Sequence, residues 1–147
     1  LTGRDYLQDF SLGQPYEFGH ERVSEQDIID FARSFDMQYY HTDPVAALDG
    51  PFGGLVASGW HSCALMHRML VKHFISPVGC LGSPGFDRLR WVAPLRPGDV
   101  LSGRCEVAAV QRSSTKKKGT VSLNIELRNR ERTLLVGQTL AIYAARN

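Results

Sequence analysis

The stretch Gly59-Trp-His-Ser-Cys-Ala-Leu-Met-His-Arg-Met-Leu-Val-Lys-His-Phe74 decides the fold. Side chains suited to burial recur along it at three- and four-residue intervals, which predicts one long amphipathic helix. The side chains that mark this stripe are Trp60, Cys63, Ala64, His67, Leu70, Val71 and Phe74. A stripe of this width indicates a helix that is buried along one side. We therefore expect this helix to lie at the centre of the fold.

The period of the apolar residues changes to two after Pro77, Gly79 and Gly82 interrupt the helix. Alternation of this kind predicts strands with one buried face. The residues expected to face inward are Leu89, Trp91 and Ala93, then Leu101, Gly103, Cys105, Val107 and Ala109, then Val121, Leu123, Ile125 and Leu127, and finally Leu134, Val136, Leu140 and Ile142. Turn-forming residues separate these runs at 94–99, 111–119 and 129–132. The pattern predicts three or four long antiparallel strands.

Two further helices are predicted ahead of the long one. Ser24-Glu-Gln-Asp27 resembles a capping box, and it predicts a helix from about residue 25 to residue 35. Residues 36–54 are rich in Asp, Pro and Gly, which indicates a loop. Within that loop, Asp43-Pro44 has the residue types of an N-cap and a first helical position, so we expect one short helix that runs through Leu48.

A long helix followed by a run of strands is typical of the α+β class, here an antiparallel β-sheet wrapped around a long central α-helix. The chain contains no internal repeat, so residues 1–147 are expected to form a single domain. A domain of this length buries about 68 to 70% of the surface that its unfolded chain exposes. A hydrophobic core can therefore form without disulfides or structural metals.

Composition excludes several classes of partner. The formal charge is only +2, and the one dense basic run, Lys116–Lys118, has no interleaved aromatic residues, so we expect no nucleic-acid partner. No stretch approaches the roughly 18 consecutive apolar residues of a membrane span. The cysteines Cys63, Cys80 and Cys105 are odd in number and widely spaced, which fits neither a disulfide framework nor a zinc module. We expect reduced cysteines and a cytoplasmic protein.

The segment from Asp36 to Gly59 carries the most information about chemistry. Gln38 follows Asp36 by two residues, His41 follows it by five, and Ser58 and Gly59 open the long helix. This pattern resembles that of the MaoC-like, or (R)-specific enoyl-CoA hydratase, family, which has an Asp, an Asn or Gln, a His, an acidic residue and then F-x-G-x-V-x-(H)-G. Here Gln38 stands in place of the usual Asn, and Ser58 stands in place of the frequent His.

The resemblance extends from Leu12 to near the C-terminus and includes the segment Arg90-Trp-Val-Ala-Pro-Leu-Arg-Pro-Gly-Asp99. It implies a hotdog fold and a hydro-lyase that acts on acyl-CoA thioesters. It also implies a homodimer, or a higher homo-oligomer built from dimers. Such an enzyme would use neither a metal nor a redox cofactor, and CoA would enter only as part of the substrate.

The chemistry of hydration gives these residues roles. Adding water to a trans-2-enoyl thioester requires a base, an acid, and donors for the negative charge that develops on the thioester oxygen. Asp36 and His41 are the expected acid–base pair. The first N–H groups of a helix have no partner within it, so the N–H of Gly59 is the expected donor to the thioester oxygen.

Four further residues are candidates for the substrate-binding or oxyanion site. Gln38 belongs to the motif, and Ser58 is better explained as the N-cap of the long helix than as a nucleophile. His61 either faces the substrate or hydrogen-bonds within the fold, and Gly54 gives backbone freedom beside the acyl group. Asp43 is left out because its role as a helix cap explains it. No histidine has the spacing of a metal ligand, so we expect no metal site.

Two alternatives remain open at this point. A hotdog thioesterase would share the fold but hydrolyse the thioester, and a non-catalytic acyl-CoA-binding subunit of a heteromeric hydratase would lack the reaction. The presence of both Asp36 and His41 favours the hydratase. Lys116–Lys118 are expected to form a solvated loop, with contact to CoA phosphates as the weaker interpretation. Arg88 and Arg90 should point away from the helix and are further candidates for CoA contacts. The identity of the acyl group is not predicted.

Overall fold

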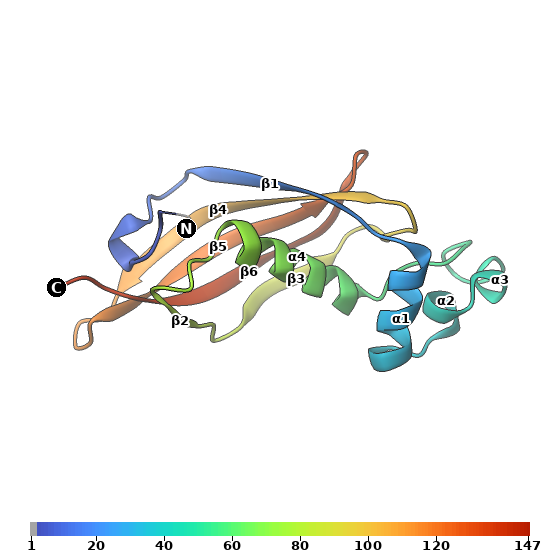
Figure 1. The fold of residues 1–147 in the computed structure, drawn as a ribbon, viewed down its shortest axis with the longest axis horizontal. Helices are drawn as coiled ribbons and strands as arrows, with labels where there is room; N and C mark the ends of the chain where they lie inside the picture. The colour runs from blue at the N-terminus through green and yellow to red at the C-terminus, as the bar shows by residue number, and fades with distance from the viewer. Residues whose placement is uncertain (1–2) are drawn as a thin grey trace.

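The computed structural model describes residues 3–147. Six strands form one antiparallel sheet, in the order β1-β4-β5-β6-β2, with β3 also paired to β6. The sheet curls around the helix α4 (Gly59–His73), which lies on its concave face (Figure 1). This arrangement confirms the predicted α+β hotdog fold.

The strands are β1 (Pro15–Arg22), β2 (Cys80–Gly82), β3 (Phe86–Trp91), β4 (Val100–Arg112), β5 (Lys118–Arg128) and β6 (Thr133–Ala144). Strands β4, β5 and β6 are the three long strands that the alternation predicts, and the turns between them lie where predicted. Strand β1 was not predicted, because its residues are mostly polar and only Tyr16 and Phe18 pack against the core. The short strand β2 was also not predicted.

The helices before α4 are η1 (Leu7–Asp9), α1 (Glu25–Phe35), α2 (Tyr39–Thr42) and α3 (Pro44–Ala47). The capping box of α1 is present, since the Ser24 hydroxyl accepts from the Asp27 N–H at 3.0 Å and the Asp27 carboxylate accepts from the Ser24 N–H at 3.1 Å. Asp43 caps α3 as predicted, accepting from the N–H groups of residues 45 and 46. The sequence did not predict α2, which places His41 in a helical turn instead of a loop.

The buried face of α4 differs from the predicted stripe. Trp60 and Val71 are 58% and 51% exposed, and Ala64 and His67 are also exposed. The buried stripe of α4 instead carries His61, Ser62, Leu65, Met66, Met69 and Leu70. Both stripes have helical spacing, but Leu65, Met66 and Met69 together form the larger apolar surface, and burying that surface contributes more free energy.

The inward face of β6 was also predicted wrongly over most of the strand. Leu135, Thr139, Ala141 and Tyr143 are buried, whereas Val136, Leu140 and Ile142 are only partly covered. Apolar residues occupy both faces of this strand, so alternation alone cannot decide between them. A shift of one residue moves every side chain to the opposite face.

One end of the molecule gathers the segments that matter for function. Helices α1, α2 and α3 and the N-terminus of α4 lie together beyond the end of the sheet, at the right of Figure 1. The β3–β4 connection and the β5–β6 turn lie at the same end. Both chain termini and the β4–β5 turn lie at the other end.

Candidate active site

Asp36 and His41 meet where α1 gives way to α2. Asp36 is the C-cap of α1, and its N–H donates to the Ala32 carbonyl. His41 follows in α2 and is buried. The Asp36 Oδ2 and His41 Nε2 atoms are 3.4 Å apart. The two residues predicted to form the acid–base pair therefore lie side by side.

The hydrogen bond from the His41 ring fixes its tautomer. Its Nδ1 lies 2.6 Å from the Val56 carbonyl oxygen, which can only accept, so the proton of the neutral ring is on Nδ1. Nε2 then carries a lone pair directed toward Asp36. A neutral His41 therefore presents a base to whatever lies beside the Asp36 carboxylate.

Asp36 is held as a carboxylate by two side-chain donors. Gln38 Nε2 donates to Oδ1 at 2.8 Å, and the Ser58 hydroxyl donates to Oδ2 at 2.7 Å. Partial burial tends to raise the pKa of Asp36, but these two hydrogen bonds and the neighbouring His41 outweigh it and hold the pKa below its usual value. The Tyr40 hydroxyl donates to Gln38 Oε1, which orients the amide nitrogen toward Asp36.

The N-terminus of α4 forms the next part of the site. Ser58 is its N-cap, because the Ser58 hydroxyl accepts from the Trp60 N–H at 3.3 Å while donating to Asp36. Gly59 is the first helical residue. Within residues 3–147, the Gly59 N–H has no hydrogen-bond acceptor. It remains available as a donor at the positive end of the helix dipole.

Trp91, at the end of β3, packs directly on Gly59. The indole Nε1 donates to the Gly59 carbonyl at 2.8 Å, and a Cβ added to Gly59 would lie 2.5 Å from the ring. This close approach is a physical reason for glycine at the start of α4. Sequence reasoning predicted that Trp91 faces the helix but missed its part in the site, because alternation does not say which helical turn a strand residue meets.

A cavity of about 500 Å³ joins these groups. Asp36, Gln38, His41 and Gly59 line it, and most of the remaining wall is apolar or aromatic, including Tyr40, Phe52, Val56, Trp60, Trp91 and Leu95. A polar corner in a largely apolar cavity suits a ligand with one reactive polar group on a hydrocarbon chain. Ser58 lies fully buried behind Asp36 and does not line the cavity.

Comparison with known proteins gives the family. The family described as MaoC like domain matches residues 9–128. The chain belongs to the MaoC-like family. It is 30% identical to the MaoC-like dehydratase from Rhodospirillum rubrum, whose crystal structure superposes with a TM-score of 0.89 over 97% of this chain and 98% of that one.

Two curated relatives extend this result. The uncharacterized protein YdeM of Bacillus subtilis is 30% identical over 101 residues, which are 69% of this chain and 72% of that protein. The 3-hydroxyacyl-thioester dehydratase Z of Mycobacterium tuberculosis is 25% identical over 126 residues, which are 84% of this chain and 83% of that protein.

His61 and Gly54 lie apart from the cavity of this MaoC-like chain. The His61 ring stacks on Phe31, with ring centroids 4.6 Å apart, on the side of α4 that faces α1. Its Nδ1 is buried, and no hydrogen-bond partner for it exists among the residues that the structure describes. Gly54 lies close to Arg96, and its neighbour Phe52 lines the cavity in its place. The geometry thus does not bring these two candidates to the reacting groups.

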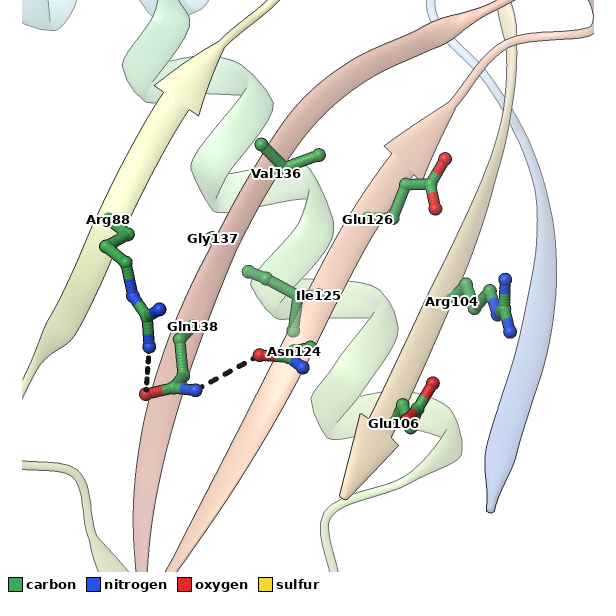
Figure 2. Close-up of a pocket in the computed structure, with 9 residues that line it drawn as sticks. All are labelled: Arg88, Arg104, Glu106, Asn124, Ile125, Glu126, Val136, Gly137 and Gln138. Carbon is green, nitrogen blue, oxygen red and sulfur yellow. Dashed lines mark hydrogen bonds between the residues drawn. The ribbon is translucent and has the colours of Figure 1, made fainter. Parts of the chain in front are cut away.

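Of the basic residues proposed as CoA contacts, Arg90 directly precedes Trp91 in β3, and its guanidinium donates to the Leu89 carbonyl at 2.9 Å. The others do not line the cavity. Lys116–Lys118 belong to the β4–β5 turn, at the end of the sheet opposite α1 (Figure 1). Arg88 lies on the outer face of the sheet, as predicted. There its guanidinium donates to Gln138 at 3.4 Å, and Gln138 donates to Asn124 at 3.1 Å (Figure 2). The hollow shown in Figure 2 therefore lies on the face of the sheet opposite α4 and shares no lining residue with the cavity beside Asp36 and His41.

Two further properties of residues 3–147 concern metals and membranes. No group of three or more His, Cys, Asp or Glu side chains within residues 3–147 is arranged to hold a metal ion. Over the same residues, every helix is too short or too polar to cross a membrane.

Proposed function

We propose that this protein is a hydro-lyase that adds water to a trans-2-enoyl-CoA or removes it from a 3-hydroxyacyl-CoA. The observation that carries the proposal is the pair of acceptors, Asp36 Oδ2 and His41 Nε2, 3.4 Å apart at the polar corner of an otherwise mostly apolar cavity. Neither atom carries a proton when Asp36 is ionised and His41 is neutral. One water molecule can satisfy both by donating one hydrogen to each, which leaves an oxygen lone pair for attack.

Each group has a defined role in the proposed reaction. The water oxygen bonds to C3 as His41 Nε2 accepts its proton, while Asp36 holds the other hydrogen and stabilises the resulting imidazolium. The C2=C3 π bond breaks, and its electrons move toward the thioester oxygen, where the Gly59 N–H and the helix dipole stabilise the charge. The His41 imidazolium then gives its proton to C2, and the enolate electrons form the C2–H bond. Water has been added, His41 is neutral again, and no external acid or base is consumed. Dehydration follows the same steps in reverse.

The surrounding residues support a thioester with a hydrocarbon chain. The apolar wall excludes water from the reacting atoms and strengthens their electrostatic interactions. The names of the relatives also support the proposal, because the Mycobacterium tuberculosis protein is a 3-hydroxyacyl-thioester dehydratase and the Rhodospirillum rubrum protein is a MaoC-like dehydratase. No cofactor takes part in the proposed steps, and CoA is part of the substrate.

We further propose that the working form is a homodimer. The side of α4 that the sheet does not cover carries Trp60 and Val71, and Trp91 and Val92 are about half exposed nearby. Exposed apolar residues in such numbers favour burial against a second copy. Sedimentation equilibrium tests this directly. A dimer that Trp60→Glu converts to a monomer would support the proposal, and a wild-type monomer at micromolar concentration would refute it.

The test of the activity follows absorbance at the enoyl-thioester band with crotonyl-CoA and longer or branched trans-2-enoyl-CoAs, with a thiol reagent in parallel. Loss of the band without free thiol is the expected result. Release of CoA thiol would instead identify a thioesterase. If neither the enoyl absorbance nor the amount of free thiol changes with any of these thioesters, a non-catalytic acyl-CoA-binding subunit would be favoured.

A further inference from the structure

The cavity beside Asp36 and His41 is the proposed site of the acyl chain, and we call it the acyl cavity. A second hollow, of about 570 Å³, adjoins the acyl cavity. We call it the basic hollow, and its charged lining consists of Arg96, Asp99, Arg130, Glu131 and Arg132. Pro94 lines both the basic hollow and the acyl cavity. The two spaces therefore share a wall formed by the β3–β4 connection, at the end of the molecule that holds Asp36 and His41.

The acidic residues of the basic hollow are committed to the fold or turned to solvent. Asp99 Oδ2 accepts from the Arg96 N–H at 2.9 Å and from Asn129 Nδ2 at 3.4 Å, so it ties the β3–β4 connection to the β5–β6 turn. The Glu131 side chain is 78% exposed and lies 3.8 Å from Arg132. The Asp99 carboxylate already accepts two hydrogen bonds, and solvent screens the charge of Glu131. The positive charge of the arginines therefore dominates the electrostatic potential in the basic hollow.

The arginines keep donors free for a ligand. Arg96 donates one N–H to the Phe52 carbonyl at 2.6 Å, which places its guanidinium beside a residue of the acyl cavity. Arg130 forms no ion pair with any part of the chain that the structure describes. A guanidinium offers several N–H donors in a planar fork that matches phosphate oxygens. Pro94, Pro97 and the hydrogen-bonded turn restrict the backbone beneath these side chains.

We infer that the basic hollow binds the nucleotide end of coenzyme A, with Arg130 and Arg132 contacting its phosphates while the acyl chain occupies the neighbouring cavity. This inference rests on the proposed function, and it assigns a binding site to the nucleotide end of the carrier proposed there. A protein carrier presents its phosphate on a broad surface, whereas these arginines line a recess whose volume falls within the range of about 300 to 1,000 Å³ typical of small-molecule sites.

The test compares two thioesters of the same acyl group. The double variant Arg130→Glu/Arg132→Glu is assayed with crotonyl-CoA and with the crotonyl thioester of N-acetylcysteamine, which lacks the nucleotide. Each charge-assisted contact contributes about tenfold or more to binding, so the ratio of kcat/KM for the CoA substrate to that for the truncated substrate should fall at least about tenfold. The matched control, Lys116→Glu/Lys117→Glu, reverses two charges at the opposite turn and should keep the wild-type ratio.

A binding measurement separates this inference from the proposed function. Adenosine 3′,5′-bisphosphate, titrated by calorimetry, should bind the wild-type protein and the lysine variant, and should bind the arginine variant at least about tenfold more weakly. If wild-type protein turns over neither thioester, the proposed function fails and this titration alone decides the inference. An unchanged ratio, an equal loss in the lysine variant, or no bisphosphate binding would each overturn it. The inference would also be overturned if the arginine variant lost activity only toward a crotonyl group carried by an acyl carrier protein.

Discussion

His41 and His61 are two buried histidines, 5% and 7% exposed, the first in α2 and the second in the first turn of α4. The His41 ring is oriented by the Val56 carbonyl, and its second nitrogen faces a carboxylate in a cavity. The His61 ring is held by stacking on Phe31, and its Nδ1 has no partner within residues 3–147. Residue type and burial are the same in both. A fixed tautomer with a free nitrogen at a cavity wall is what makes one of them suited to catalysis.

Replacing each histidine should have very different effects on turnover. His41→Ala removes the proposed base, and a general base typically contributes about 10² to 10⁴ in rate, so turnover of crotonyl-CoA should fall at least about a hundredfold. His61→Gln should stay within about fivefold of wild type, because His61 does not line the cavity. Steady-state kinetics, with circular dichroism to verify folding, measure both. Equal losses of turnover in His41→Ala and His61→Gln would contradict the different roles assigned to the two histidines.

Asp36→Asn should lower turnover by about a hundredfold. The amide has nearly the same shape as the carboxylate but lacks its charge, and it can direct an N–H group at the position where a water hydrogen should bind. The fold should be retained, since Ser58 and Gln38 can still hydrogen-bond to the amide. Kinetics and thermal melting are measured on the same preparation. Turnover close to wild type in a folded Asp36→Asn protein would exclude Asp36 from the reaction.

Gly59→Ala should lower kcat/KM roughly tenfold to a hundredfold, because displacing a wall of the site by about 1 Å is enough for such an effect. The added methyl overlaps the Trp91 ring, which must move and carry part of the cavity wall with it. Tryptophan fluorescence should change together with activity. The double variant Gly59→Ala/Trp91→Leu removes the overlap and should recover part of the loss. No recovery would show that the overlap with Trp91 is not the cause.

Ser58→Ala should destabilise the protein by about 0.5 to 2 kcal/mol, the usual range for loss of an N-cap. It also removes a donor to Asp36, which should raise the pKa of that carboxyl group and move the acid limb of the pH–rate profile to higher pH. Ser24→Ala is the matched control, since Ser24 caps α1 without contacting Asp36. It should cost similar stability in urea and leave the acid limb in place. An identical shift in both variants would contradict the assigned role of Ser58.

The smallest expected effect concerns the stability contributed by His61. Burial lowers the pKa of His61, with Asp27 acting to raise it and Arg68 to lower it. The unfolded chain therefore binds a proton more readily than the folded one as pH falls through about 6.5, and the contribution present above that pH is lost below it. The urea midpoint of wild type should fall more between pH 7.5 and pH 5.5 than that of His61→Gln. Equal falls would refute this linkage.

Local signals in the sequence predicted much of the fold and the pairing of Asp36 with His41. The capping box at Ser24 and the Asp43-Pro44 start are set by hydrogen bonds within a few residues, so they can be recognised without tertiary information. Asp36 and His41 are five residues apart, and their proximity depends mainly on α1 ending and α2 beginning between them. Resemblance to the MaoC-like family supplied their chemical roles, which the local pattern alone does not give.

The features that sequence missed depend on long-range packing. Helix α4 has two apolar stripes, and the one that becomes buried is the one with the larger apolar area. Strand β6 also has apolar residues on both faces, so packing against the rest of the fold decides which face points inward. The contact of Trp91 with Gly59 joins residues 32 positions apart. The sequence left open whether His61 faces the substrate or a neighbouring part of the fold, and packing against Phe31 of α1 decides for the fold.

The central claim is that Asp36 and His41 act as a unit on one water molecule. The most direct measurement is a double-mutant cycle on crotonyl-CoA hydration, with Asp36→Asn, His41→Ala and the double variant followed at the enoyl band. Groups that share one function are strongly non-additive, so the double variant should lose little more activity than the more damaging single variant. Losses that multiply would show that the two residues act independently, which would contradict the account.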